Sequence, residues 1–292
     1  MTVRGAVRGA APCLALDIGA TKVDAALVQS DGTLVRSEQL LLGDLDEDLL
    51  TPIIQMLERV RAEADVAALG VGCAGPMSRN GERVSPLNIP RWRDFPLLAR
   101  LTGATGLDVF IDGDARALAL AEGVYGAARS DESYLSMVVS TGIGGGLVLN
   151  DRLVDGSTGN AGHVGHLNVV RDGRDCSCGS RGCLEAEASG SAIEAMTGRA
   201  PVEADLPMRE RVADLVGRAV GTLSAVLDFE RCYIAGSVAL GFGDAFFARA
   251  NAAATEINTM SYSKHLVLSP SGLGSRGPVL GAALVGWRGL DR

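Results

Sequence analysis

The sequence contains two similar glycine-rich segments, and this repetition restricts the folds that the chain can adopt. Residues 14–35 read LALDIGATKVDAALVQSDGTLV, and residues 135–154 read LSMVVSTGIGGGLVLNDRLV about 120 residues later. Each has an apolar run, a glycine turn, a second apolar run and a polar turn, which is the pattern of a β-hairpin. The separation exceeds the period of solenoid repeats. The pattern therefore predicts a duplicated lobe, with one hairpin opening each half and a nucleotide held between the halves.

The turns of both hairpins carry residues suited to a nucleotide. Glycine lets a phosphate approach the backbone closely, and a nearby acid can hold a hydrated magnesium ion. Neither turn is a Walker loop or a dinucleotide fingerprint, and the first turn, DIGATK, would also suit an ordinary tight hairpin. The candidate nucleotide-binding residues are Asp17, Gly19, Thr21 and Lys22 in the first turn and Thr141, Gly142 and Gly144 in the second.

Residues 159–187 predict a structural zinc site. Cys176, Cys178 and Cys183 lie within eight residues, and His166 lies ten residues before the first of them. Zinc prefers four tetrahedral sulfur and nitrogen ligands, and a Cys3His set leaves no open position for a reacting water. The alternative is three free or buried cysteines, but the spacing CSCGSRGC is crowded and specific.

Two further polar residues border this segment. His163 precedes His166 by three residues, and Glu185 follows Cys183 by two. A loop ordered by a metal is a good support for side chains that must contact a ligand. Glu185 could also stabilise the N-terminus of the following helix, and the two roles are compatible.

These motifs resemble those of a known family. GNAGHVGH followed by CSCGSRGCLEAEASG resembles the signature of the ROK family, a group of repressors, open reading frames and sugar kinases, and the likeness extends over about residues 14–290. It implies an α/β, two-lobed actin-like or hexokinase-like (ribonuclease H-like) fold with a zinc-binding loop. The expected parts are a small lobe (1–113), a large lobe (114–276) containing the zinc loop (159–187), and a C-terminal helix (277–292) that packs back on the first lobe.

The resemblance also implies a catalytic base. Residues 109–123, VFIDGDARALALAEG, predict a strand ending in acids and then a helix, so Asp114 could face a cleft or simply cap the helix. The segment resembles the family's ENDANAAALGE, whose aspartate is the base, and Asp114 occupies that position. Gly113 and Arg116 depart from the pattern, since each replaces an asparagine.

The sugar and adenosine residues are carried over in the same way. The sugar pocket is expected to contain Gly75, Asn88, Gly113, Asp114, His163, His166 and Glu185. Adenosine is expected at Gly236 and Ser237, where CYIAGSV stands in place of the family's GGGV. Asn88 and Gly236 could instead be ordinary turn residues.

The resemblance thus implies an ATP-dependent kinase that uses Mg2+, carries structural Zn2+ and phosphorylates the 6-hydroxyl of glucose or a glucose-like amino sugar. In the family's glucokinases a glutamate occupies the position of His163 and accepts hydrogen bonds from sugar hydroxyls. That substitution, and an acid at Asp112 beside Gly113, favour an amine at C3 or C2 of the sugar. The alternatives are an N-acetylhexosamine kinase, acting on N-acetylmannosamine or N-acetylglucosamine, and a sugar sensor without catalysis.

Composition bears on partners and compartment. A net charge of −8 argues against a nucleic-acid-binding surface. The sequence has no run of 18 or more apolar residues, so no membrane-spanning helix is expected. Cys13, Cys73 and Cys232 stand in apolar contexts and predict buried thiols, which together with zinc thiolates favour the cytoplasm. A homodimer is expected from the resemblance alone.

One long helix is expected after the zinc loop. Residues 207–228 have apolar residues at helical spacing, so we expect a single buried face. The residues expected on that face are Val212, Leu215, Ala219, Leu223 and Val226.

Overall fold

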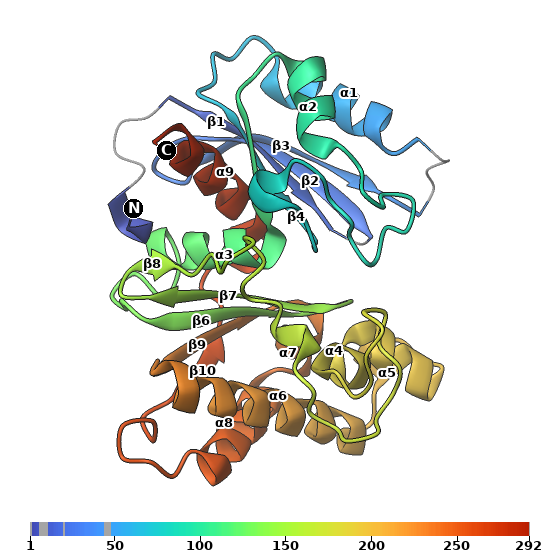
Figure 1. Ribbon diagram of the computed structural model, residues 1–292, viewed down its shortest axis with the longest axis vertical. Coiled ribbons are helices and arrows are strands. Elements are labelled where there is room, and N and C mark those ends of the chain that lie inside the picture. The colour runs from blue at the N-terminus through green and yellow to red at the C-terminus, as the bar shows by residue number, and fades with distance from the viewer. Residues whose placement is uncertain (1, 6–10, 20, 44–47, 292) are drawn as a thin grey trace. The chain divides into compact units, whose positions relative to one another are not determined.

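A computed structural model describes residues 2–5, 11–19, 21–43 and 48–291 of the chain (Figure 1). The chain divides into two compact units. The first contains residues 1–125, 152–161 and 273–292, and the second contains residues 126–151 and 162–272. Within the described ranges, none of the helices has both the length and the apolar character needed to cross a bilayer.

The first unit is built on a five-stranded sheet. Its elements are β1 (Cys13–Ile18), β2 (Lys22–Val28), β3 (Leu34–Leu41), β4 (Leu69–Cys73), β5 (Val109–Gly113), β8 (Arg152–Leu153), α1 (Leu50–Arg61), α2 (Leu97–Thr105), α3 (Asp114–Val124), α9 (Gly277–Leu290), and the 3-10 turns Val3–Gly5, Arg79–Gly81 and Gly274–Arg276. The strand order is β3-β2-β1-β4-β5, with β1 and β2 antiparallel and β4 and β5 parallel to β1. All residues of β1 and β4 are buried, as in strands covered on both faces. In Figure 1, α1 and α2 cover one face of this sheet, and α9 and α3 cover the other.

The second unit repeats this topology. Its elements are β6 (Tyr134–Val139), β7 (Ile143–Leu149), β9 (Arg231–Ala235), β10 (Val267–Pro270), α4 (Leu184–Ala188), α5 (Gly190–Thr197), α6 (Leu206–Leu227), α7 (Ser237–Phe242), α8 (Asp244–Ile257), and the 3-10 turns Val164–His166 and Pro201–Glu203. The order β10-β9-β6-β7 within the unit matches β5-β4-β1-β2, and again the first two strands form an antiparallel hairpin to which the later strands are parallel. The predicted α/β fold with two duplicated halves is therefore confirmed.

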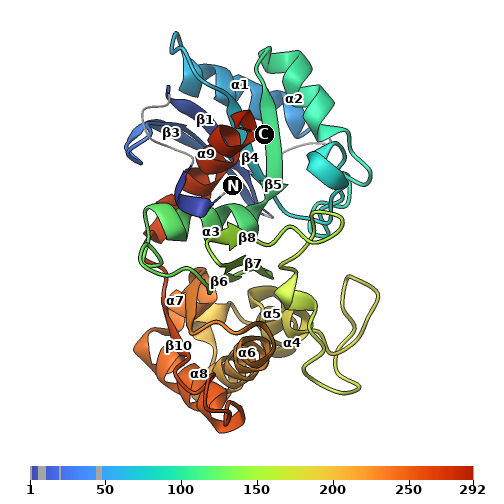
Figure 2. The same cartoon turned by 60° about the vertical axis from the view of Figure 1, so that its left-hand side comes forward.

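Helix α3 belongs to the first unit, whereas the sequence placed the boundary between lobes at residue 113. The difference follows from packing, because α3 lies against α9 and β4 (Figure 2). Segment 152–161 also belongs to the first unit, although it follows a hairpin of the second.

The helices α3 and α9 approach so closely that the contact requires glycine. A Cβ atom added to Gly281 would lie 2.4 Å from the carbonyl oxygen of Ala117. We expect Gly281→Ala to lower the free energy of unfolding by about 1–3 kcal/mol, because the overpacked helices must move apart. Chemical denaturation measures this change.

Gly103→Ala in α2 is the matched control, because no atom lies within 4 Å of the added Cβ. This variant should be as stable as the parent or up to about 1 kcal/mol more stable. Equal losses in both variants would contradict the packing explanation.

The long helix α6 is present as predicted, and its buried face matches the expected one in part, because Val212 and Ala219 are buried. Val226 is 75% exposed, while Val216 and Val220 are fully buried. A Cβ atom on Gly217 would lie 2.1 Å from the Ala250 carbonyl oxygen, so α8 packs directly against the small residues of α6. The expected face did not include Gly217, although its lack of a side chain is what allows this close packing.

The three isolated cysteines are buried, as predicted. Cys13, Cys73 and Cys232 have no exposed surface. Burial raises the pKa of the Cys13 thiol to about 12 and that of Cys73 well above its usual range. These thiols are parts of the core.

Candidate active site and metal centre

Acidic residues gather at the carboxyl edge of the first sheet. Asp17 of β1 is in register with Gly72 of β4, and Gly72 is in register with Asp112 of β5. A Cβ atom on Gly72 would lie 3.0 Å from Asp17 Oδ1 and 3.4 Å from the Asp114 Cα. Gly72 therefore keeps open the space between Asp17 and Asp114, at the edge where open α/β sheets commonly bind ligands.

Asp17 is held in an environment that disfavours its charge. It is 8% exposed, and among the described residues no donor reaches its Oδ1 atom. Burial, followed by the charges of Asp114 and Asp24, holds the pKa of Asp17 well above its usual range. A bound cation would reverse this preference, and an unsatisfied carboxylate oxygen beside a second acid is a donor set that fits hydrated magnesium.

The first glycine turn lies next to these acids, and a backbone hydrogen bond closes it. The Gly19 amide donates to the Lys22 carbonyl oxygen at 3.0 Å, and Lys22 forms an ion pair with Asp24 at 2.8 Å. Thr21 is exposed beside Lys22. The predicted phosphate-facing residues Gly19, Thr21 and Lys22 thus lie in one turn at the end of β1.

Asp114 is the first residue of α3. Its Oδ1 accepts a hydrogen bond from the Ala115 amide at 2.7 Å, which fixes the carboxylate at the helix N-terminus. The side chain is only partly buried, so it remains within reach of a substrate. The N-cap position of α3 is Gly113, so the capping role considered for Asp114 is wrong, whereas a position facing a cleft stays a prediction.

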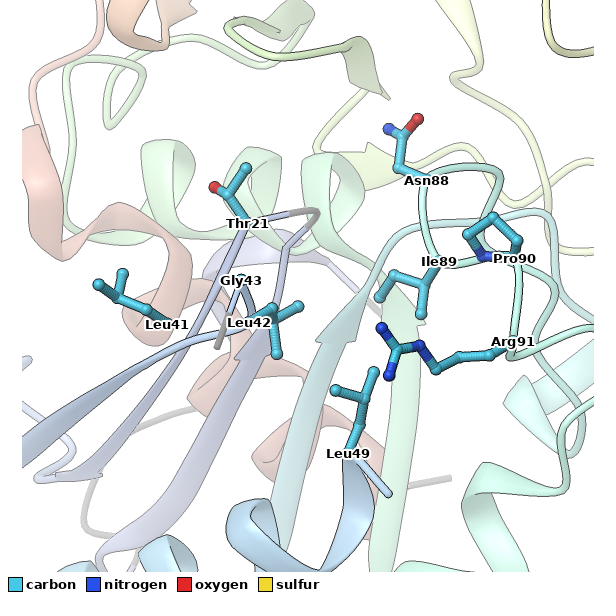
Figure 3. A pocket seen from close by; sticks show the side chains of 9 residues that line it. All are labelled: Thr21, Leu41, Leu42, Gly43, Leu49, Asn88, Ile89, Pro90 and Arg91. Atoms are coloured by element: carbon cyan, nitrogen blue, oxygen red, sulfur yellow. The ribbon is translucent and has the colours of Figure 1, made fainter. Parts of the chain in front are cut away.

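A pocket in the first unit brings together two predicted residues from separate loops. It has a volume of about 460 Å³ and contains Thr21 and Asn88 (Figure 3). Its other lining residues are Leu41, Leu42, Gly43, Leu49, Ile89, Pro90 and Arg91. Gly75 lies near the same loop, because its carbonyl oxygen accepts from the Leu87 amide at 3.3 Å. The pocket is within the size range of small-molecule sites.

The predicted metal ligands converge in the second unit. One ligand atom from each of His166, Cys176, Cys178 and Cys183 lies within 4.8 Å of all the others. Cys176 Sγ is 3.6 Å from His166 Nδ1, and Cys178 Sγ is 3.7 Å from Cys183 Sγ. Tetrahedral zinc with bonds of about 2.3 Å to sulfur separates its ligands by about 3.8 Å, so the spacing fits a Cys3His zinc site.

Glu187, which was not among the residues predicted from the sequence, anchors the metal loop. It is 2% exposed, accepts from the Arg174 amide at 2.6 Å and pairs with Arg211 of α6 at 2.5 Å. Little in the sequence indicated this role, because an acid two residues after Glu185 resembles any other polar residue of a short helix.

The histidine loop is held against β7 by close backbone contact. Gly162 has φ 107°, and a Cβ atom there would lie 2.2 Å from the Gly145 carbonyl oxygen. Only glycine can combine a positive φ with such a close approach to another backbone segment. The loop places the ring of His163 5.9 Å from that of His166.

Glu185 connects the metal loop to the second glycine turn. Its Oε2 accepts a hydrogen bond from the Ile143 amide, the first residue of β7, at 2.8 Å. This contact is neither of the two roles considered from the sequence. It places the Glu185 carboxylate beside the Thr141–Gly142 turn.

The second glycine turn also gathers the predicted adenosine residues. Ser140 Oγ is 3.0 Å from Ser237 Oγ, and Ser191 Oγ donates to the Thr141 carbonyl oxygen at 3.0 Å. Gly236 precedes Ser237 and has φ 103°. Thr141, Gly142, Gly236 and Ser237 therefore lie at the same end of the second sheet, with Gly144 following in β7.

Comparison with known proteins identifies the family. The model of the ROK family matches residues 13–287, and the chain therefore belongs to the ROK family. It is 36% identical to a glucokinase of Thermotoga maritima over 184 residues, which are 62% of this chain and 58% of that relative. The chain thus spans less than two thirds of the length of this relative.

Two further relatives match over more of their length. An N-acetylmannosamine kinase of Haemophilus influenzae is 33% identical over 253 residues, covering 79% of this chain and 82% of the relative. The crystal structure of a ROK family glucokinase from Streptomyces griseus, in complex with glucose and AMPPNP, matches with a TM-score of 0.84 and 25% identity. That match covers 95% of this chain and 99% of the other.

Proposed function

We propose that this protein is an ATP-dependent sugar kinase that phosphorylates the 6-hydroxyl of glucose or a glucose-like amino sugar. The observation that carries the proposal is the approach of Asp17 and Asp114 across Gly72 at the carboxyl edge of the first sheet. Phosphoryl transfer requires a base for the attacking hydroxyl and a site for the metal that accompanies ATP. The Streptomyces griseus glucokinase, which binds glucose and AMPPNP, supports this assignment by similarity.

Asp114 is the proposed general base. Its carboxylate accepts the proton of the sugar hydroxyl as that oxygen attacks the γ-phosphate in line. Asp17 would hold magnesium, and the charge of that ion would stabilise the negative charge of the transferring phosphoryl group. The backbone amides of the turns at Gly19 and Gly142 orient the phosphates, with Thr21, Lys22, Thr141 and Gly144 beside them, while Gly236 and Ser237 contact adenosine.

The sugar contacts are proposed for Gly75, Asn88, His163, His166 and Glu185. His166 serves both sites, because a metal-bound imidazole keeps its second nitrogen as a donor to a hydroxyl group. Glu185 is fixed by the Ile143 amide and presents an acceptor. Zinc at the Cys3His group is proposed to hold His163, His166 and Glu185 in place.

An ammonium group was expected beside Gly113 and Asp112, but the contacts of Arg116 argue against that position. A Cβ atom on Gly113 would lie 3.2 Å from Arg116 Cδ, so the arginine occupies the space. Asp112 is already paired with Arg116 at 2.5 Å. Among the residues described above that depart from the family pattern, His163 is therefore the one proposed to distinguish amino sugars from glucose. A neutral imidazole can accept a hydrogen bond from an amine.

We expect His163→Glu to move the ratio of kcat/KM values toward glucose and away from 2-amino- and 3-amino-glucose. A carboxylate offers two acceptor oxygens to hydroxyl groups, and sites built for a hydrogen-bonding substituent discriminate against analogues that lack it. Steady-state kinetics on the three sugars give the ratio. No change in the ratio would remove His163 from substrate selection.

The function itself is tested by ADP release with a sugar panel. We expect sugar-dependent release with glucose or an amino-glucose, using mannose and N-acetylmannosamine as further members. Preference for N-acetylmannosamine would instead support the activity named for the Haemophilus influenzae relative. A sugar that binds without any ADP release would indicate a sensor.

A further inference from the structure

Arg116 is a buried arginine two residues after the proposed base, and the proposed mechanism does not use it. Arg116 is 5% exposed. Nε donates to Asp112 Oδ1 at 2.5 Å and one terminal nitrogen reaches Asp112 Oδ2 at 3.3 Å, so the contact is bidentate. Burial of this kind is costly for a cation unless every donor is satisfied.

The remaining donors of Arg116 all reach segment 152–161. One terminal nitrogen forms an ion pair with Asp155 at 2.7 Å. The other donates to the carbonyl oxygen of Val154, and to that of Ala161 at 3.2 Å. A single guanidinium therefore binds both ends of a loop that begins with β8, which packs beside α3 (Figure 2).

A second contact holds the same segment from another direction. Asn160 accepts from the Met77 amide at 3.0 Å and donates to the Met77 carbonyl oxygen at 2.9 Å. Met77 follows Gly75 by two residues, and Ala161 is followed in the chain by Gly162 and His163. Segment 152–161 thus contacts the helix that begins at Asp114 and the loop after Gly75, and in the sequence it runs into the loop that carries His163.

Gly113 and Arg116 form a matched pair. Gly113 has φ −60° and ψ 138°, a conformation open to any residue, so its lack of a side chain is not required by the backbone. A Cβ atom there would lie 3.2 Å from Arg116 Cδ, a close contact that the Arg116 stem would have to relieve by a small shift. The two departures from the family's motif thus lie in contact with each other.

We propose that Arg116 is a positioning residue that fixes segment 154–161 to the strand and helix carrying Asp112 and Asp114, and thereby sets the affinity of the site for its sugar. This inference rests on the proposed function for its sugar-binding part. Arg116 acts through the segment and does not touch the reacting atoms. Lysine cannot replace it, because one ammonium group cannot serve two carboxylates and two carbonyl oxygens in a fixed fork.

The test is Arg116→Lys in the full chain, with two readouts. Backbone amides of residues 154–161 should exchange with deuterium faster than in the parent, as measured by mass spectrometry. The KM for the best sugar of the panel should rise about tenfold while the KM for ATP stays within about twofold. Asp155→Asn, which removes one of the two ion pairs at a half-exposed residue, should change both quantities in the same direction by less.

Arg249→Lys in α8 is the matched control, since Arg249 also pairs with two acids but lies in the second unit. It should leave both readouts unchanged. Unaltered exchange in Arg116→Lys, or faster exchange with an unaltered sugar KM, would overturn the inference. If Arg116→Lys does not fold, Asp155→Asn decides by the same criteria. Failure of the proposed function would differ, because the parent would release no ADP with any sugar, and deuterium exchange would still report whether Arg116 anchors the segment.

Discussion

Asp114→Asn should lower kcat by about 10²- to 10⁴-fold while leaving sugar affinity nearly unchanged. An amide cannot accept the hydroxyl proton, but its oxygen can still accept the Ala115 amide hydrogen bond that fixes residue 114 at the start of α3. The fold should therefore be retained. A coupled assay for ADP gives kcat, and titration calorimetry gives the affinity for the sugar.

Asp108→Asn is the matched control, because Asp108 is an exposed aspartate directly before β5. Its kcat should equal that of the parent. If Asp114→Asn retained activity within about tenfold of the parent, Asp114 would not be the base.

Cys178→Ser should remove the bound metal and lower the midpoint temperature of thermal unfolding by more than about 5 °C, because metal binding and loop folding are coupled. Four ligand atoms within 4.8 Å of one another would be held in place by bonds to one shared ion, and this constraint is lost when one thiolate is removed. Elemental analysis of the freshly purified protein should find about one zinc per chain in the parent. Differential scanning calorimetry gives the midpoint.

Ser177→Ala is the control for this change, since Ser177 lies between two ligands and is exposed. It should retain the metal. A parent protein that contains no zinc when freshly purified would refute the prediction. A chelator separates the two possible roles of the ion: loss of turnover before any loss of structure would indicate catalytic zinc, and simultaneous loss would indicate structural zinc.

The fold was predictable because its main signals are local. Each hairpin contains its two apolar strands and its turn within about 20 consecutive residues. In the tight turn between β7 and β8, Asn150 and Asp151 adopt the left-handed conformations that a two-residue turn requires. The metal ligands span only residues 166–183, so their spacing alone indicated that they could converge. The end of β5 and the start of α3 were visible in the change from apolar residues to acids.

The parts that could not be predicted depend on contacts between distant residues. Glu185 meets Ile143 and Arg116 meets Asp155 across about 40 positions of the chain, and no local pattern indicates such a pair. The expected ammonium site failed for the same reason, because adjacency of Asp112 and Gly113 in sequence says nothing about the arginine that fills the space. The buried face of α6 was predicted only in part, because its close contact with α8 depends on tertiary packing.

The discontinuity of the first unit has a consequence for the order of events during translation. Helix α9 covers one face of the sheet formed by β1, β4 and β5, yet it follows the entire second unit in the chain. Until the ribosome has made residues 277–290, the apolar face that receives this helix lacks its cover, and the glycine contact between α3 and α9 cannot form. The N-terminal sheet must therefore wait in an incomplete state while the second unit emerges. This interval is when binding by a chaperone would matter most.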